Sequence, residues 1–346
     1  MLRNIRRATL QVLRTSGVSR WAAHSRWRQQ RLLILCYHGV SQDDEHLWLP
    51  NLYMEPAVLR QRLEILQRGS YNILPLGQAV EQLRAGDLPP RSVVISFDDG
   101  MCDFYSRSYP LLQSYGFPVT VYQTTYYADF QKPVFNLICS YMLWKRRGSV
   151  LNKGAELGLK PSLDLRSESS RKEVMLELMH RAEADHLSGG QRDELAARLA
   201  SALQIDYQDV GRKRLLHVMN PQEISELASA GVDFQLHAHR HRTPMDEAPF
   251  RKEIQENRQR LQSMTKSDAI HFCYPSGEYH RQFLPWLEAE GVVSATTCNP
   301  GLATARTHPL LLPRFVDTSA RSALEFEGWL AGVSALLTFK RAAKAD

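Results

Sequence analysis

The chain has 346 residues, of which 43% are hydrophobic and 23% are charged, and its formal net charge is +6. This length and balance fit one large α/β domain or two ordinary ones with a buried core. No run of about 18 apolar residues occurs, so the sequence predicts no segment that spans a bilayer. The cysteines are scattered, odd in number and without a Cys-x-x-Cys pair, which argues against a disulfide framework or a thiolate zinc site and is typical of a reducing compartment.

Positive charge is concentrated in residues 1–31, where arginines alternate with apolar residues and no acid precedes Asp43. Three interpretations stay open: a basic amphipathic segment on an anionic membrane, an organelle transit peptide, or a solvated tail packed loosely on the domain. The segment lacks the long apolar core of a secretory signal, so we expect a cytoplasmic protein, peripheral at the inner membrane face. We expect no nucleic-acid partner, because the basic excess is confined to this segment.

The first half of the domain alternates strands with helices. Apolar or β-branched runs predict strands at 32–37, 71–75, 93–97 and 118–122, and periodic stretches predict helices at 56–69, 76–85 and 104–115. This alternation is typical of a parallel sheet or barrel covered by helices, in which functional groups gather at the carboxyl ends of the strands. His38 and the pair Asp98 and Asp99 occupy such ends.

The alternation stops at about 126–213, where the helix-favouring stretches 171–186 and 191–203 have no strand between them. We interpret this region as a helical insertion rather than a second domain. Six aromatic residues near its start either line a binding wall or form the insertion's own core: Tyr126, Tyr127, Phe130, Phe135, Tyr141 and Trp144.

The alternation then resumes within a domain that we place at 32–330. Helices are predicted at 220–231, 250–264 and 281–290, and strands at 232–236, 270–274 and 292–297. From Ala320 the chain is expected to be helical, and residues 331–346 form a basic tail.

Two groups of residues could carry chemistry. Gly100 permits a turn after Asp98 and Asp99 that lets both carboxylates converge, although a helix-capping loop explains the same residues. His237 and His241 are four residues apart and share a face on either a strand or a helix, so both can meet one cation. One aspartate and two histidines form a ligand set that leaves a position open for water. The intervening histidine, at 239, would join them on a strand but point away on a helical turn.

Three motifs together resemble a known family: Ser-Phe-Asp-Asp-Gly at 96–100, His-x-x-x-His at 237–241 and Phe-Cys-Tyr-Pro-Ser-Gly at 272–277. They are similar to those of the polysaccharide deacetylases with a NodB-type domain, carbohydrate esterase family 4. Further matches at 35–40, 109–118 and 312–315 extend the resemblance over roughly 32–125 and 214–318. The resemblance implies a distorted (β/α)7-type barrel and metal-dependent removal of acetyl groups from sugars.

The resemblance also implies roles for individual residues. Asp99, His237 and His241 match the metal ligands, Asp98 matches the general base, and the backbone N–H of Tyr274 matches the oxyanion donor.

The catalytic acid and the residue that orients the base depart from the usual pattern of the family. The acid is expected at His38, which fits an early Tyr-His motif of permuted relatives, with His308 as the alternative. The family's arginine position falls on Cys273, so Arg314 is the candidate to orient Asp98 instead.

The implied substrate is an acetylated polysaccharide, oligosaccharide or lipid-linked sugar, with N-acetyl groups expected above O-acetyl groups. The implied cofactor is a divalent metal ion, zinc before cobalt, nickel or iron. Two alternatives stay open: hydrolysis of a non-sugar amide, and a catalytically inactive carbohydrate-binding domain. The complete set of two aspartates and two histidines argues against the second.

Overall fold

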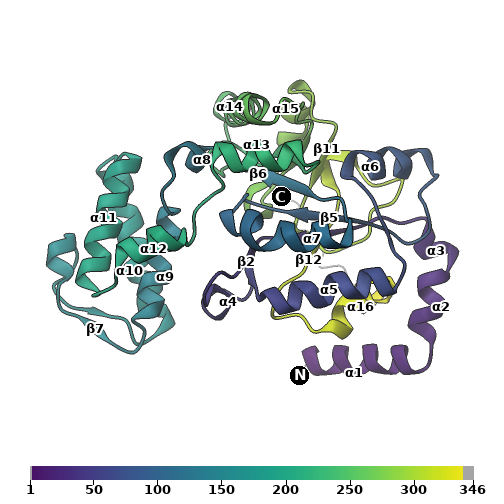
Figure 1. Ribbon diagram of the computed structural model, residues 1–346, viewed down its shortest axis with the longest axis horizontal. Coiled ribbons are helices and arrows are strands. Elements are labelled where there is room, and N and C mark those ends of the chain that lie inside the picture. Colours follow the sequence, from purple (N-terminus) through teal and green to yellow (C-terminus); the bar gives the residue numbers. More distant parts are fainter. Residues whose placement is uncertain (1, 338–346) are drawn as a thin grey trace.

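The computed structural model describes residues 2–337 and has a curled half-barrel of parallel strands at its centre (Figure 1). The strands follow the order β11-β10-β9-β6-β5-β1-β12, and β4 pairs with the beginning of β5. The (β/α) barrel predicted from the sequence is therefore confirmed. The strands are β1 (Leu33–Tyr37), β4 (Asn72–Ile73), β5 (Ser92–Phe97), β6 (Thr120–Gln123), β9 (Asp233–Leu236), β10 (His271–Cys273), β11 (Ser294–Thr296) and β12 (Phe315–Val316).

The segment before β12 spans the gap between the two outer strands. Leu312 bridges to Thr296 of β11, and β12 pairs with β1 through Phe315 and Val316. The strand β12 was not predicted, because two residues are too short to show a period.

Helices cover the outside of the half-barrel, and every residue of β1 and β5 is buried, as a parallel sheet packed on both faces requires. The predicted helix at 104–115 begins as a π-helical segment, η1 (Phe104–Ser108), before α7 (Tyr109–Tyr115). Pro110 has no N–H to donate, which disrupts a regular ladder at this point. The other covering helices are α5 (Pro56–Arg68), α6 (Leu76–Ala85), α13 (Pro221–Ser229), α14 (Glu247–Thr265) and α15 (Phe283–Ala289).

The region predicted as a helical insertion forms a cluster of helices at one side of the half-barrel, at the left of Figure 1. It contains α8 (Tyr126–Phe130), α9 (Phe135–Lys145), α10 (Glu168–Ala184), α11 (Gly189–Ala202) and α12 (Tyr207–Lys213), together with an unpredicted hairpin of β7 (Val150–Leu151) and β8 (Leu163–Asp164). The aromatic residues of the insertion do not share one environment. Phe135 and Tyr141 are buried in the core, whereas Tyr126 and Tyr127 line a cleft beside the half-barrel.

The N-terminal segment folds into α1 (Leu2–Thr15), α2 (Val18–His24) and α3 (Arg26–Gln29), which pack near α16 (Ala323–Leu330) and α17 (Val333–Leu337). Arg28 is fully buried and donates hydrogen bonds to the carbonyl oxygens of Leu330 and Arg31 at 2.8 and 2.7 Å. Burial lowers the pKa of Arg28 to about 10. A loosely packed tail is therefore the wrong description of α2 and α3.

The predicted helical tail is present as α16 and α17, and its basic end lies outside the described residues. Within residues 2–337 no helix is both long and apolar enough to cross a bilayer.

Candidate active site

The turn after β5 directs two adjacent carboxylates to different neighbours. The N–H of Asp98 still donates to the carbonyl of Tyr37 in β1, at 2.9 Å, whereas Asp99 and Gly100 both have a φ of 70°. A Cβ at position 100 would overlap the side chain of Gln123, so glycine is required there for space as well as for φ. The two carboxylates line one cleft, as the predicted turn allows, and each has its own partner there.

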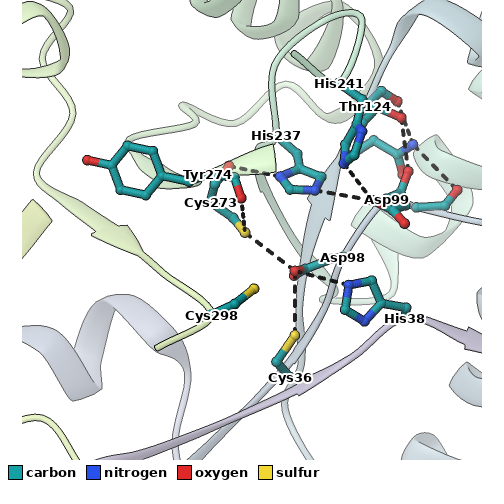
Figure 2. Close-up of polar contacts among 12 residues, drawn as sticks. Cys36, His38, Asp98, Asp99, Thr124, His237, His241, Cys273, Tyr274 and Cys298 are labelled. Carbon is teal, nitrogen blue, oxygen red and sulfur yellow. Dashed lines mark hydrogen bonds and ion pairs between the residues drawn. The ribbon is translucent and has the colours of Figure 1, made fainter. Parts of the chain in front are cut away.

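Asp99 meets the two histidines four residues apart (Figure 2). Its Oδ1 lies 3.2 Å from Nε2 of His237 and 3.2 Å from Nε2 of His241. Nδ1 of His237 donates to the carbonyl of Cys273 at 2.8 Å, so Nε2 is the ring nitrogen that faces Asp99. Burial opposes ionisation of Asp99, but the two imidazoles hold the pKa of this carboxyl well below its usual value.

These three side chains fit a divalent cation. One donor atom from each lies within 4.8 Å of the others, and two imidazoles with one carboxylate are a common set around zinc. Two further groups also bring possible ligands together, but each includes Asp98, which already faces a guanidinium. They are Cys36, His38 and Asp98, and Asp98, His237 and Cys273.

The loop that carries the histidines is neither strand nor helix. It follows β9, and Ala238 and His241 adopt positive φ values of 58° and 54°. These turns bring both rings to Asp99, while His239 is directed to Thr125, with its Nδ1 2.8 Å from the Thr125 hydroxyl. The predicted convergence of His237 and His241 is confirmed, although the regular element assumed for it is absent from this part of the chain.

Two residues of α14 that the sequence analysis missed hold this loop. Asn257 is fully buried, accepts the N–H of His237 at 2.9 Å and donates to the hydroxyl of Thr125 at 3.0 Å. Glu253 accepts the N–H of Arg240 at 2.7 Å. The sequence did contain a signal for these two residues, because they form an i, i+4 polar pair on the apolar face of a helix, where buried polar groups need hydrogen-bond partners.

Asp98 forms a buried bidentate pair with Arg314. The two carboxylate oxygens lie 2.7 Å from Nη1 and Nη2, and the two side chains are 2% and 0% exposed. Burial alone would raise the pKa of Asp98, but Arg314 holds it below its usual range. The predicted contact of Arg314 with Asp98 is therefore confirmed. The thiol of Cys273 lies beside this pair, 3.0 Å from Nη2 of Arg314.

His38 lies beside this pair and His308 does not. Nε2 of His38 is 3.7 Å from Oδ2 of Asp98, its side chain is 15% exposed, and it lines the cleft. Burial lowers the pKa of His38. Nδ1 of His308 instead accepts the N–H of Leu310, at 3.2 Å, and caps a 3-10 turn away from the residues that line the cleft.

The prediction for Tyr274 requires correction. Its backbone N–H donates to the carbonyl of Thr296 at 3.2 Å, as part of the sheet, and is not free for an oxyanion. Its ring points away from the acid and histidine groups in Figure 2, and its hydroxyl donates to Leu310 at 3.0 Å. The following residues, Ser276 and Gly277, line the cleft instead.

Comparisons with known proteins find similarity to polysaccharide deacetylases. A family model described as polysaccharide deacetylase matches residues 85–159 and 205–294. The poly-beta-1,6-N-acetyl-D-glucosamine N-deacetylase of Escherichia coli (strain K12) is 30% identical over 97 residues, which make up 28% of this chain and only 14% of that protein.

Solved structures share the fold at low identity. The Streptococcus pyogenes deacetylase PplD in complex with acetate is 19% identical with a TM-score of 0.56, and the likeness covers 84% of this chain and 94% of that one. IcaB from Ammonifex degensii is 14% identical with a TM-score of 0.53, and the likeness covers 88% of this chain and 99% of that one.

Proposed function

We propose that this chain, which belongs to the polysaccharide deacetylase family, hydrolyses the acetamide of an N-acetylated glycan with zinc as the bound divalent cation. The observation that carries the proposal is that the two adjacent carboxylates after β5 have different partners. Asp99 meets His237 and His241 at 3.2 Å, while Asp98 meets Arg314 at 2.7 Å, and both acids line the same cleft.

A cation held by Asp99, His237 and His241 would polarise the acetyl carbonyl and lower the pKa of a coordinated water. Asp98 is ionised because Arg314 holds its pKa low, so its carboxylate accepts the proton of the attacking water. The water oxygen bonds to the carbonyl carbon, and the carbon–nitrogen bond then breaks. His38, whose Nε2 is 3.7 Å from Asp98, delivers a proton to the departing amine, which leaves free amine and acetate.

The test is acetate release from oligomers of N-acetylglucosamine and from an aryl acetate, with and without a chelator. Asp98→Asn is expected to keep bound metal and to lose at least about a hundredfold in turnover. His237→Ala is expected to lose metal by elemental analysis, and Asp87→Asn, at an exposed loop, is the matched control. Glycan binding without acetate release would favour a carbohydrate-binding domain, and release by Asp98→Asn at the wild-type rate would remove that residue as the base.

We also propose that α1 and α2 rest on an anionic membrane surface. Val12, Val18 and Trp21 are exposed by 63%, 41% and 74%, and exposed arginines at positions 7 and 20 flank them. Cosedimentation with anionic but not neutral liposomes is expected, and Trp21→Ser should weaken it. Equal binding of the variant, or equal binding to neutral liposomes, would contradict this proposal.

A further inference from the structure

The cleft that contains the candidate active site extends well beyond it. Its volume is about 870 Å³, which is near the upper end for a small-molecule site and leaves room beside a single acetylated sugar. One end is polar and holds the acids and histidines described above. The other end is formed by the helical insertion, which stands beside the half-barrel in Figure 1. We call the part of this end beyond α8, whose Tyr126 and Tyr127 also line the cleft, the insertion wall; its residues are Val134, Asn136, Leu137, Met179, Glu183, Leu187 and Arg192.

Four of the seven residues of the insertion wall are apolar. Leu137 on α9, Met179 on α10 and Leu187 before α11 are all partly buried, so each shows part of its side chain to the cleft. Leu52 and Val218 add apolar surface to the same cleft. Such side chains neither donate nor accept hydrogen bonds, so sugar hydroxyls covered by them would lose their hydrogen bonds to water without replacement. A hydrocarbon group has no such loss and gains from leaving water.

The same wall carries one cation with unused donors. Nε of Arg192 donates to the carbonyl of Leu187 at 3.1 Å, and among the described residues its terminal nitrogens form no ion pair. The two other arginines in the cleft, Arg240 and Arg242, are both paired with Glu253. A planar guanidinium beside an apolar surface is suited to a phosphate attached to a hydrocarbon.

We propose, on the basis of the deacetylase function above, that the insertion wall binds the aglycone of a lipid-linked sugar. In this arrangement the acetylated sugar lies at the acids and histidines, the phosphate that joins it to the lipid faces Arg192, and the hydrocarbon chain lies against Leu137 and Met179. The substrate class is therefore an N-acetylated sugar joined through phosphate to a hydrocarbon, rather than a free polysaccharide.

Four substrates with the same acetyl group separate the parts of this proposal. They are the trimer of N-acetylglucosamine, N-acetylglucosamine 1-phosphate, its octyl phosphodiester, and octyl N-acetylglucosaminide without phosphate, all used below micellar concentrations. We expect the octyl phosphodiester to have a kcat/KM at least about a hundredfold above that of the trimer, with the two partial analogues between them. Equal values for the trimer and the phosphodiester would overturn the proposal.

Variants of the insertion wall test which side chain contacts which part of the substrate. Met179→Gln should raise the KM of both octyl substrates at least about tenfold relative to that of the trimer, and Leu176→Gln, exposed on the same helix, is its control. Arg192→Gln should raise KM only for the phosphodiester and the 1-phosphate, with exposed Arg198→Gln on α11 as its control. Glu183→Gln removes a negative charge from the same wall and should lower those two KM values. A Met179→Gln effect as large on the trimer as on the octyl substrates would assign the wall to the glycan.

Calorimetry separates this proposal from the proposed function. The octyl phosphodiester is titrated into Asp98→Asn protein, in which no turnover is expected. Tighter binding than that of N-acetylglucosamine 1-phosphate, weakened by Met179→Gln, supports the insertion wall even if no substrate releases acetate. Equal binding of the two ligands would overturn the wall while leaving the proposed hydrolysis intact.

Discussion

Replacing Arg314 by methionine removes the guanidinium that pairs with Asp98, the candidate base. In Arg314→Met the carboxylate of Asp98 keeps its buried position but loses both 2.7 Å hydrogen bonds. Because the two side chains are 0% and 2% exposed, water screens neither of them. Leaving one member of a buried ion pair without its partner costs about 3–5 kcal/mol. The loss of Arg314 also removes the 3.0 Å hydrogen bond from its Nε to the carbonyl of Thr297, which costs about 1 kcal/mol more. We therefore expect the free energy of unfolding to fall by roughly 4–6 kcal/mol.

Activity should fall further than stability alone explains. Without Arg314, burial raises the pKa of Asp98, and a protonated carboxyl cannot accept the proton of water. Acetate release per folded molecule should decrease by about 10²–10⁴. Urea unfolding followed by circular dichroism measures the first effect, and acetate release at a concentration of folded protein fixed by that curve measures the second.

The pair Arg62 and Asp317 provides a matched control. It is also buried, with Nε 2.8 Å from Oδ2 and side chains 1% and 0% exposed, but neither residue lines the cleft. Arg62→Met should lose comparable stability and retain acetate release per folded molecule. In the double variant Asp98→Asn with Arg314→Met, part of the lost stability should return because no buried charge remains. A stability loss below about 1 kcal/mol in Arg314→Met, or equal activity losses in the two arginine variants, would refute this reasoning.

Three further predictions follow from the surroundings of the site. Burial raises the pKa of Asp103 to about 8 in the folded protein, above the unfolded value near 3.9. The contribution of Asp103 to stability is therefore present at low pH and is lost as pH rises toward 8. Between pH 5 and 8, urea unfolding should show the free energy of unfolding of Asp103→Asn rising by up to about 4 kcal/mol relative to that of wild type. Asn257→Ala should weaken zinc binding about 10–100-fold in a chelator competition, because the N–H of His237 loses its acceptor. Gly100→Ala should lower the free energy of unfolding by more than about 1 kcal/mol, because φ is 70° and a Cβ meets Gln123.

Each of these has an outcome that contradicts it. A difference between Asp103→Asn and wild type that does not change with pH would mean that Asp103 titrates normally in the folded protein. Unchanged zinc affinity in Asn257→Ala would show that the histidine loop keeps its geometry without α14. A Gly100→Ala protein as stable as wild type would show that the turn after β5 can adopt another conformation.

Local pattern in the sequence was sufficient for the longer strands and helices and for part of the site. Buried parallel strands appear as continuous apolar runs, and residues at their carboxyl ends share one edge of the sheet, so His38 and Asp98 could be placed near each other. The even spacing of His237 and His241 predicted that their rings meet at one cation site, and the resemblance named Asp99 as the third member of that site. These inferences needed only neighbours along the chain and the rule that strands in such folds run parallel.

The resemblance named Arg314 as a candidate partner of Asp98, but only the tertiary structure decided which distant groups pair in the site. Asp98 and Arg314 are 216 positions apart, and their pairing depends on how the segment before β12 crosses from β11 to β1. Sheet register likewise commits the N–H of Tyr274 to Thr296, and the packing of α14 gives His237 its acceptor. A hydrogen bond across the fold depends on the alignment of whole elements, and that alignment is set by the packing of the core rather than by the residues adjacent in sequence.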